Sequence, residues 1–127
     1  MISARYEQRD NAVWIIVSGH VDRSQAERFY EELPALVAQC GKGFTVVTDL
    51  SSLEVMDLDV APMIRRGMEF FNQHGVAQVF RVIPDPAKDI GFNIMSMFHY
   101  SDDVATLTFP SRDEAAAHFE KRAYNIR

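Results

Sequence analysis

Short apolar runs alternate with amphipathic helical segments along this chain, and that alternation limits the possible folds more than any other feature. Residues 44–48 form a short run rich in β-branched side chains, which is typical of a buried strand. After a polar stretch, apolar residues recur at helical spacing over residues 60–71. The same succession returns as a strand over residues 76–83 and a helix from residue 86 to about residue 99. Strands and helices that alternate in this way predict a mostly parallel sheet covered by helices.

Two strands and a helix precede this repeated unit. Residues 3–8 and 12–17 are both interpreted as strands, and the short polar link between them predicts an antiparallel hairpin. Asp22 or Ser24 can cap the next helix by accepting a backbone N–H. Pro34 predicts either a kink in that helix or its division into two pieces. The apolar face of the helix is formed by Ala26, Phe29, Leu33, Leu36, Val37 and Cys40.

Prolines and caps set the remaining boundaries. Because Pro62 is tolerated in the first turn of a helix, the helix after the polar stretch should begin at residues 59–61, and Gly75 can end it. A fifth strand is predicted at residues 105–109, and Ser111 with Glu114 forms a capping box that opens a last helix. The predicted fold is a single α/β domain over residues 1–127, with a mixed, mostly parallel five-stranded sheet, four helices and the order β-β-α-β-α-β-α-β-α.

Composition narrows the classes of function. A formal net charge of −5 argues against a general nucleic-acid binder, because such a protein needs a basic face for phosphates. No apolar run approaches the roughly 18 residues that a membrane-spanning helix requires. The N-terminal residues lack the layout of a signal peptide, and the single cysteine, Cys40, cannot form an internal disulfide. Both observations lead us to expect a cytoplasmic protein.

Local motifs predict neither a cofactor nor a metal. The sequence contains no glycine-rich phosphate loop, and its four histidines have no His or Cys neighbours at metal-ligand spacing. Acidic side chains gather in a loop predicted over residues 49–57 and at the start of the next helix; they are Asp49, Glu54, Asp57 and Asp59. Carboxylates at the end of a parallel strand can serve acid–base catalysis, but no nucleophile or cation stands beside these in sequence. We therefore interpret them as loop and cap residues and predict a non-enzymatic protein.

Two helices carry more apolar residues than one core-facing stripe requires. On the helix over residues 86–99, Phe92 and Met95 lie off the main apolar face, and Met68, Phe70 and Phe71 widen the face of the preceding helix. Because the two helices follow successive parallel strands, they can lie side by side and present a joint surface to a partner or a second copy of the chain. Core packing accounts for the same residues, so both interpretations stand at this point.

Three segments carry a resemblance to a known family. Residues 17–22 read Val-Ser-Gly-His-Val-Asp, and residues 46–51 read Val-Val-Thr-Asp-Leu-Ser. These are similar to two strands of the anti-sigma-factor antagonist (STAS) domains, which end in Gly-x-hydrophobic-Asp and in Asp-Leu-Ser. Residues 56–61 read Met-Asp-Leu-Asp-Val-Ala, where the family usually shows hydrophobic-Asp-Ser-Ser-Gly-Leu. The order of elements also resembles that of the STAS fold over nearly the whole chain.

The third segment departs from the family pattern at its regulatory residue. In regulatory members, the second serine of Asp-Ser-Ser-Gly is phosphorylated by a partner kinase, and phosphorylation breaks the complex. Matching by position puts Asp59 at that serine, Leu58 at the first serine and Val60 at the glycine. A serine kinase cannot phosphorylate an aspartate, which carries a permanent negative charge with fewer oxygens than phosphoserine. The resemblance therefore implies a member without the ordinary phosphorylation switch.

Two kinds of function follow from the resemblance. The first is binding of a protein partner, either an anti-sigma-factor-like kinase or a second copy of the chain. The surface would be the loop over residues 49–59 and the two helices that follow, with the contact residues Asp49, Ser51, Asp57, Leu58, Asp59, Phe92 and Met95. The alternative is a carrier of a small molecule or lipid, as in domains of similar topology to the antagonist-like group. Its apolar pocket between helices would be lined by Met63, Met68, Phe71, Phe92 and Met95.

Overall fold

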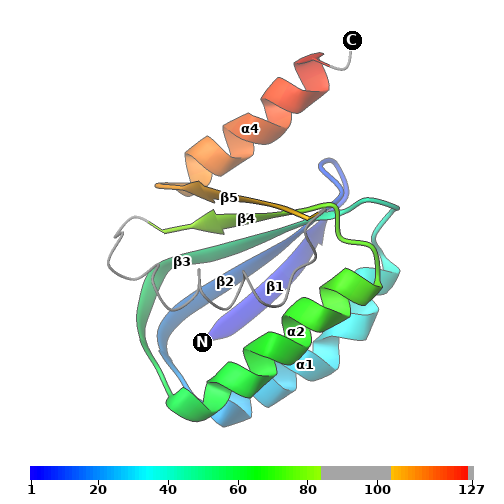
Figure 1. Ribbon diagram of the computed structural model, residues 1–127. Coiled ribbons are helices and arrows are strands. Elements are labelled where there is room, and N and C mark those ends of the chain that lie inside the picture. The colour runs from blue at the N-terminus through cyan, green and yellow to red at the C-terminus, as the bar shows by residue number, and fades with distance from the viewer. Residues whose placement is uncertain (84–103, 126–127) are drawn as a thin grey trace.

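A computed structural model describes residues 1–83 and 104–125 as one α/β unit (Figure 1). In chain order the elements are β1 (Ile2–Glu7), β2 (Ala12–Val21), α1 (Arg23–Ala38), β3 (Thr45–Met56), the 3-10 turn η1 (Leu58–Val60), α2 (Ala61–Gln73), β4 (Gln78–Val82), β5 (Ala105–Phe109) and α4 (Arg112–Asn125). The five strands form one mixed sheet in the order β1-β2-β3-β4-β5, antiparallel between β1 and β2 and parallel elsewhere. The predicted sheet is therefore confirmed. Three α-helices lie within the described residues, and the helix expected over residues 86–99 lies outside them.

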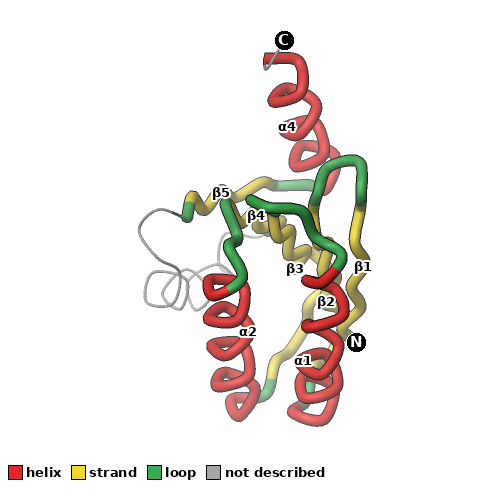
Figure 2. Tube along the Cα trace, turned by 90° about the vertical axis from the view of Figure 1, so that its right-hand side faces the viewer, coloured by secondary structure: helices red, strands yellow, loops and turns green. Residues whose placement is uncertain are grey.

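Helices cover the sheet on both faces. Helices α1 and α2 lie side by side on one face, whereas α4 lies on the other face beside β4 and β5 (Figures 1 and 2). Because side chains alternate along a strand, each strand contributes to two cores. The larger core, beneath α1 and α2, includes Val13, Ile15, Val17, Leu33, Val37, Val46, Leu50 and Phe71. The smaller core, beneath α4, consists of Ala12, Trp14, Val47, Phe80, Val82, Ala115 and Phe119.

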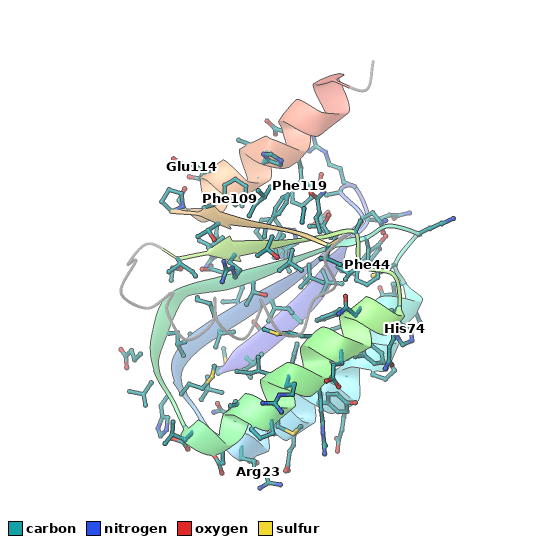
Figure 3. The ribbon with its side chains drawn as sticks, viewed as in Figure 1. Arg23, Phe44, His74, Phe109, Glu114 and Phe119 are labelled. Atoms are coloured by element: carbon teal, nitrogen blue, oxygen red, sulfur yellow. The ribbon has the colours of Figure 1, made fainter. Side chains whose placement is uncertain are left out.

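Aromatic rings build the smaller core. The ring centroid of Phe80 lies 5.1 Å from that of Phe109 and 4.9 Å from that of Phe119. Figure 3 shows Phe109 on β5 and Phe119 on α4 facing the same space between the sheet and the helix. One hydrogen bond of the predicted capping box is present at the start of α4, because Ser111 Oγ accepts the Glu114 N–H at 3.2 Å. The cap and the rings together place the start of α4 against the end of the sheet.

The predicted loop over residues 49–57 is wrong, because β3 continues as a strand to Met56. Its second half pairs with the second half of β2, which places Ser52 opposite Ser18 and Met56 opposite Val21. The register shifts twice along this pair, because β3 has one residue more than β2 between Ile16 and Ser18 and again between Gly19 and His20, and such extra residues bend the strands. Asp, Ser and Glu are poor strand formers, so the polar composition suggested a loop, but backbone pairing with β2 outweighs that local preference.

The helix boundaries agree with most of the caps read from the sequence. Asp22 Oδ1 accepts the Gln25 N–H at 2.9 Å, so Asp22 rather than Ser24 caps α1. Pro34 lies inside α1, which runs as one helix, so the predicted division into two pieces is not observed. Pro62 lies in the first turn of α2, as expected. Gly75 has φ of +84°, and the N–H of Val76 reaches back to the Phe71 carbonyl at 3.1 Å, which is a glycine C-terminal cap.

Candidate functional site

Strands β2 and β3 end together, and their ends bring two of the three family-like segments into contact. The Asp57 N–H donates to the Val21 carbonyl at 3.0 Å, which extends the ladder one residue beyond β3. His20 Nε2 lies 2.6 Å from Asp57 Oδ1, and both side chains are open to solvent. Neighbouring parallel strands end at the same edge of a sheet, so segments 37 residues apart become neighbours here.

Negative charge surrounds this end of the molecule. The Asp57 carboxylate accepts a hydrogen bond from the His20 ring and thereby raises the pKa of His20. The charges of Asp57 and Asp22 raise this pKa further. Arg23, at the start of α1 (Figure 3), pairs with Glu27 at 2.9 Å. The pKa of Arg23 is raised chiefly by that hydrogen bond with Glu27, and also by the charge of Asp59. The cations here are thus bound by the protein's own carboxylates.

The turn η1 separates an exposed leucine from a buried valine. The Val60 N–H donates to the Asp57 carbonyl at 3.0 Å, which closes the turn. Val60 is 0% exposed and belongs to the larger core, whereas Leu58, two residues earlier, is 95% exposed. Val55, the register partner of His20, is 55% exposed. We call the surface formed by His20, Val55, Asp57, Leu58 and Asp59 the η1 surface.

Asp49 lies apart from the η1 surface, because its side chain is directed under α4. It is 1% exposed and accepts hydrogen bonds from the Ser51 N–H at 2.9 Å and the Ser51 hydroxyl at 2.6 Å. Its other oxygen forms an ion pair with Arg112, the first residue of α4. Asp49 therefore connects β3 to α4, a role that its position in the sequence does not indicate.

A cavity of about 110 Å³ lies between the sheet and the helices α1 and α2. Three of the residues expected to line an apolar pocket, Met63, Met68 and Phe71, do line it, so the structure brings them together. The lining continues onto η1 through Val60 and onto β3 through Met56. The other two expected residues, Phe92 and Met95, lie outside the described residues.

No group of three or more His, Cys, Asp or Glu side chains among the described residues is arranged to hold a metal ion. Of the helices described, none is long and apolar enough to cross a membrane.

Comparison with known proteins identifies the fold through solved structures. No family model and no curated protein matches the chain. An uncharacterised protein of the DUF3478 family from Shewanella loihica, with a SpoIIAA-like fold, matches 94% of this chain over 92% of its own, at 12% identity and a TM-score of 0.72. The unphosphorylated anti-sigma factor antagonist SpoIIAA matches 95% of this chain over 98% of its own, at 15% identity and a TM-score of 0.66.

A third structure agrees with these two. An anti-sigma factor antagonist from Mycobacterium paratuberculosis matches 94% of this chain over 95% of its own, at 19% identity and a TM-score of 0.58. The matches span nearly the whole of each chain. The protein has a STAS-like α/β fold, as its three sequence segments indicated.

In the structure, the predicted contact residues that are described fall into two separate groups. Asp57, Leu58 and Asp59 were expected together and form the centre of the η1 surface, whereas Asp49 and Ser51 form a separate cluster with Arg112. His20 was not among the predicted contact residues. Its position at the end of a strand, in a segment that resembled the family, is the signal that could have identified it.

Proposed function

We propose that this protein is a non-enzymatic, STAS-like interaction domain that binds a protein partner through the η1 surface. The observation that carries the proposal is the 95% exposure of Leu58 on a turn whose other end, Val60, is fixed in the core. Within the described residues, the large hydrophobic side chains that are exposed are Met1, Val55 and Leu58, so two of the three belong to this surface. Exposed apolar side chains on an ordered strand end and turn are available to a partner without prior rearrangement.

The charges of the η1 surface define the complementary partner. Asp57 and Asp59 lie on either side of Leu58, and Asp22 adds its charge near His20. A partner that fits would present an apolar depression for Leu58 within a basic rim, because complementary potentials speed association and exclude other partners. The anti-sigma factor antagonists that share the fold favour an anti-sigma-factor-like kinase as this partner, with a second copy of the chain as the other candidate.

Asp59 makes the surface permanently negative. It occupies the position that resembles the phosphorylated serine of regulatory members, and its exposed side chain lies in η1, which directly precedes α2. A carboxylate near a helix N-terminus is favourable for the helix and does not depend on a kinase. We infer that partner binding here is not switched by serine phosphorylation at this position.

A charge reversal at Asp59 tests the proposal. Tagged protein is used to capture partners from a lysate of the source cells, the captured protein is purified, and its affinity is measured by calorimetry. Asp59→Arg and Leu58→Arg should each weaken binding at least about tenfold, which corresponds to about 1.4 kcal/mol. Glu31→Arg makes the same charge change on the exposed face of α1 and should leave the affinity within twofold.

The result that contradicts the proposal is an affinity that Asp59→Arg and Leu58→Arg leave unchanged. Sedimentation velocity of the purified chain separates the two candidate partners. A dimer that dissociates in Leu58→Arg identifies a second copy of the chain as the partner. A monomer that still binds the captured protein identifies a different partner.

A further inference from the structure

The cavity beneath α1 and α2 has the character of a binding site for a small molecule. Among the described residues, its walls include Ile15 and Leu50 from the sheet, Leu33 from α1, Val60 from η1, and Met63 and Phe71 from α2. Native cores are packed as densely as organic crystals and leave few voids larger than a water molecule. A cavity of about 110 Å³ is well above that size, and its mostly apolar lining offers few groups to hold water.

Gly67 keeps this space open. It lies in the interior of α2, where glycine weakens a helix relative to alanine, and it lines the cavity. A Cβ atom placed on Gly67 would lie 3.9 Å from Leu33 Cδ1, an ordinary van der Waals contact. Alanine therefore fits at this position and would improve both the helix and the packing. The chain instead has the residue that leaves the space empty.

We propose that this cavity binds a small, uncharged, mostly apolar molecule of about the size of one aromatic ring. An apolar cavity of about 150 Å³ lined by Leu, Ile and Phe is known to stay dry and to bind benzene. The present cavity is somewhat smaller, so the space bounded by the described residues suits a single ring better than the long acyl chain of a lipid. The volume thus favours a ligand molecule much smaller than the lipid that the resemblance suggested.

The lining also indicates how such a molecule would lie. Met63 and Met68 are half-buried, and their unbranched thioether side chains can change rotamer to admit a ring and then pack against it. Thr48 and Arg81 line the cavity from the sheet side, and Arg81 Nη2 donates a hydrogen bond to Thr108 Oγ1 at 3.1 Å. A ligand with one hydroxyl or carbonyl group would direct that group toward the sheet and its ring toward the methionines.

Methyl NMR on the full chain tests this proposal without any protein partner. The chain contains six methionines, and their methyl groups are labelled with carbon-13. Titration with toluene and with p-cresol should shift the signals of Met63 and Met68, while Met1, which is largely exposed and does not line the cavity, should not move. Decanoate serves as the acyl-chain probe and should bind at least tenfold more weakly than p-cresol.

Gly67→Ala provides the decisive variant. It should fold, melt at a higher temperature and bind toluene and p-cresol at least tenfold more weakly, because its methyl group occupies the ligand's space. Arg66→Ala changes the adjacent, exposed position of α2 and should keep the affinity within twofold. The proposal is overturned if neither ring shifts Met63 and Met68 up to its solubility limit, or if Gly67→Ala binds them as tightly as the unmodified chain. Decanoate binding as tight as that of p-cresol would overturn the size argument.

Discussion

The ion pair between Asp49 and Arg112 should contribute measurably to stability, although one of its members is half exposed. Asp49 is 1% exposed, and without Arg112 its carboxylate would keep only the two hydrogen bonds that Ser51 donates, within the described residues. Breaking a fully buried ion pair costs about 3–5 kcal/mol. Because the Arg112 side chain is 52% exposed, solvent screens the pair and replaces part of the interaction. We therefore expect Arg112→Ala to lower the free energy of unfolding by about 2 kcal/mol, as for a hydrogen bond to a charged group.

A double-mutant cycle in urea measures this contribution. The variants are Arg112→Ala, Asp49→Asn and the double substitution, and unfolding is followed by circular dichroism and by tryptophan fluorescence. Trp14 is the only tryptophan, and its ring centroid lies 6.3 Å from that of Phe119, so its emission reports the docking of α4. In the Asp49→Asn background, Arg112→Ala should cost at least about 1 kcal/mol less than in the unmodified chain.

A stabilising ion pair is ruled out if Arg112→Ala changes the free energy of unfolding by less than about 0.5 kcal/mol, or if the two substitutions are additive within that error. Arg23→Ala is the matched control, because Arg23 forms an ion pair with Glu27 at 2.9 Å that is wholly at the surface. That variant should show no measurable loss of stability.

Two further predictions concern the ends of β2 and α1. An NMR titration should give His20 a pKa above its ordinary value of 6.5, and Asp57→Asn should return it toward that value, because the Asp57 carboxylate favours the protonated ring. Since the folded-state pKa is the higher one, the stabilisation from this pair is fully present below the pKa of the unfolded chain and is lost as pH rises through the folded-state pKa. An unshifted His20 pKa would show that the hydrogen bond does not persist in solution. Asp22→Ala should lower the free energy of unfolding in urea by about 1 kcal/mol, because it removes the cap on the Gln25 N–H, whereas Ser24→Ala should cost less than half as much. Equal losses for the two variants would contradict the assignment of the cap.

The order of helices and strands was predictable because most of these elements are indicated by the residue pattern of their own segment. Apolar residues at helical spacing, a proline in a first turn and a glycine after a last turn indicate α2 and its ends without reference to the rest of the chain. The polar second half of β3 was not predictable in this way. Residues 52–56 form a strand because β2 extends far enough to pair with them. The extension of β2 depends in turn on this pairing, so neither strand end can be predicted from its own residues alone.

The candidate site was predictable only where its residues are contiguous. Asp57, Leu58 and Asp59 follow one another, so a motif of a few residues identified them. Asp49 and Arg112 are 63 residues apart, and no local feature of either predicts their contact. The buried position of Asp49 follows from the alternation of side chains along β3, where Leu50 faces α1 and α2 and Asp49 faces α4. If this segment is predicted as a loop, side chains are not expected to alternate between two faces, and Asp49 is wrongly expected to be exposed.

The η1 surface and the cavity share a wall, which determines how the two proposals relate. Leu58 and Val60 belong to the same three-residue turn, one exposed to solvent and the other lining the cavity. Met56 also lines the cavity and directly precedes Asp57. A ring that displaces Val60 would therefore move Leu58, because the turn is closed by the hydrogen bond from the Val60 N–H to the Asp57 carbonyl. Any resulting change in partner affinity must be matched by an equal change in ligand affinity when the partner is bound, because coupling between two binding sites is reciprocal.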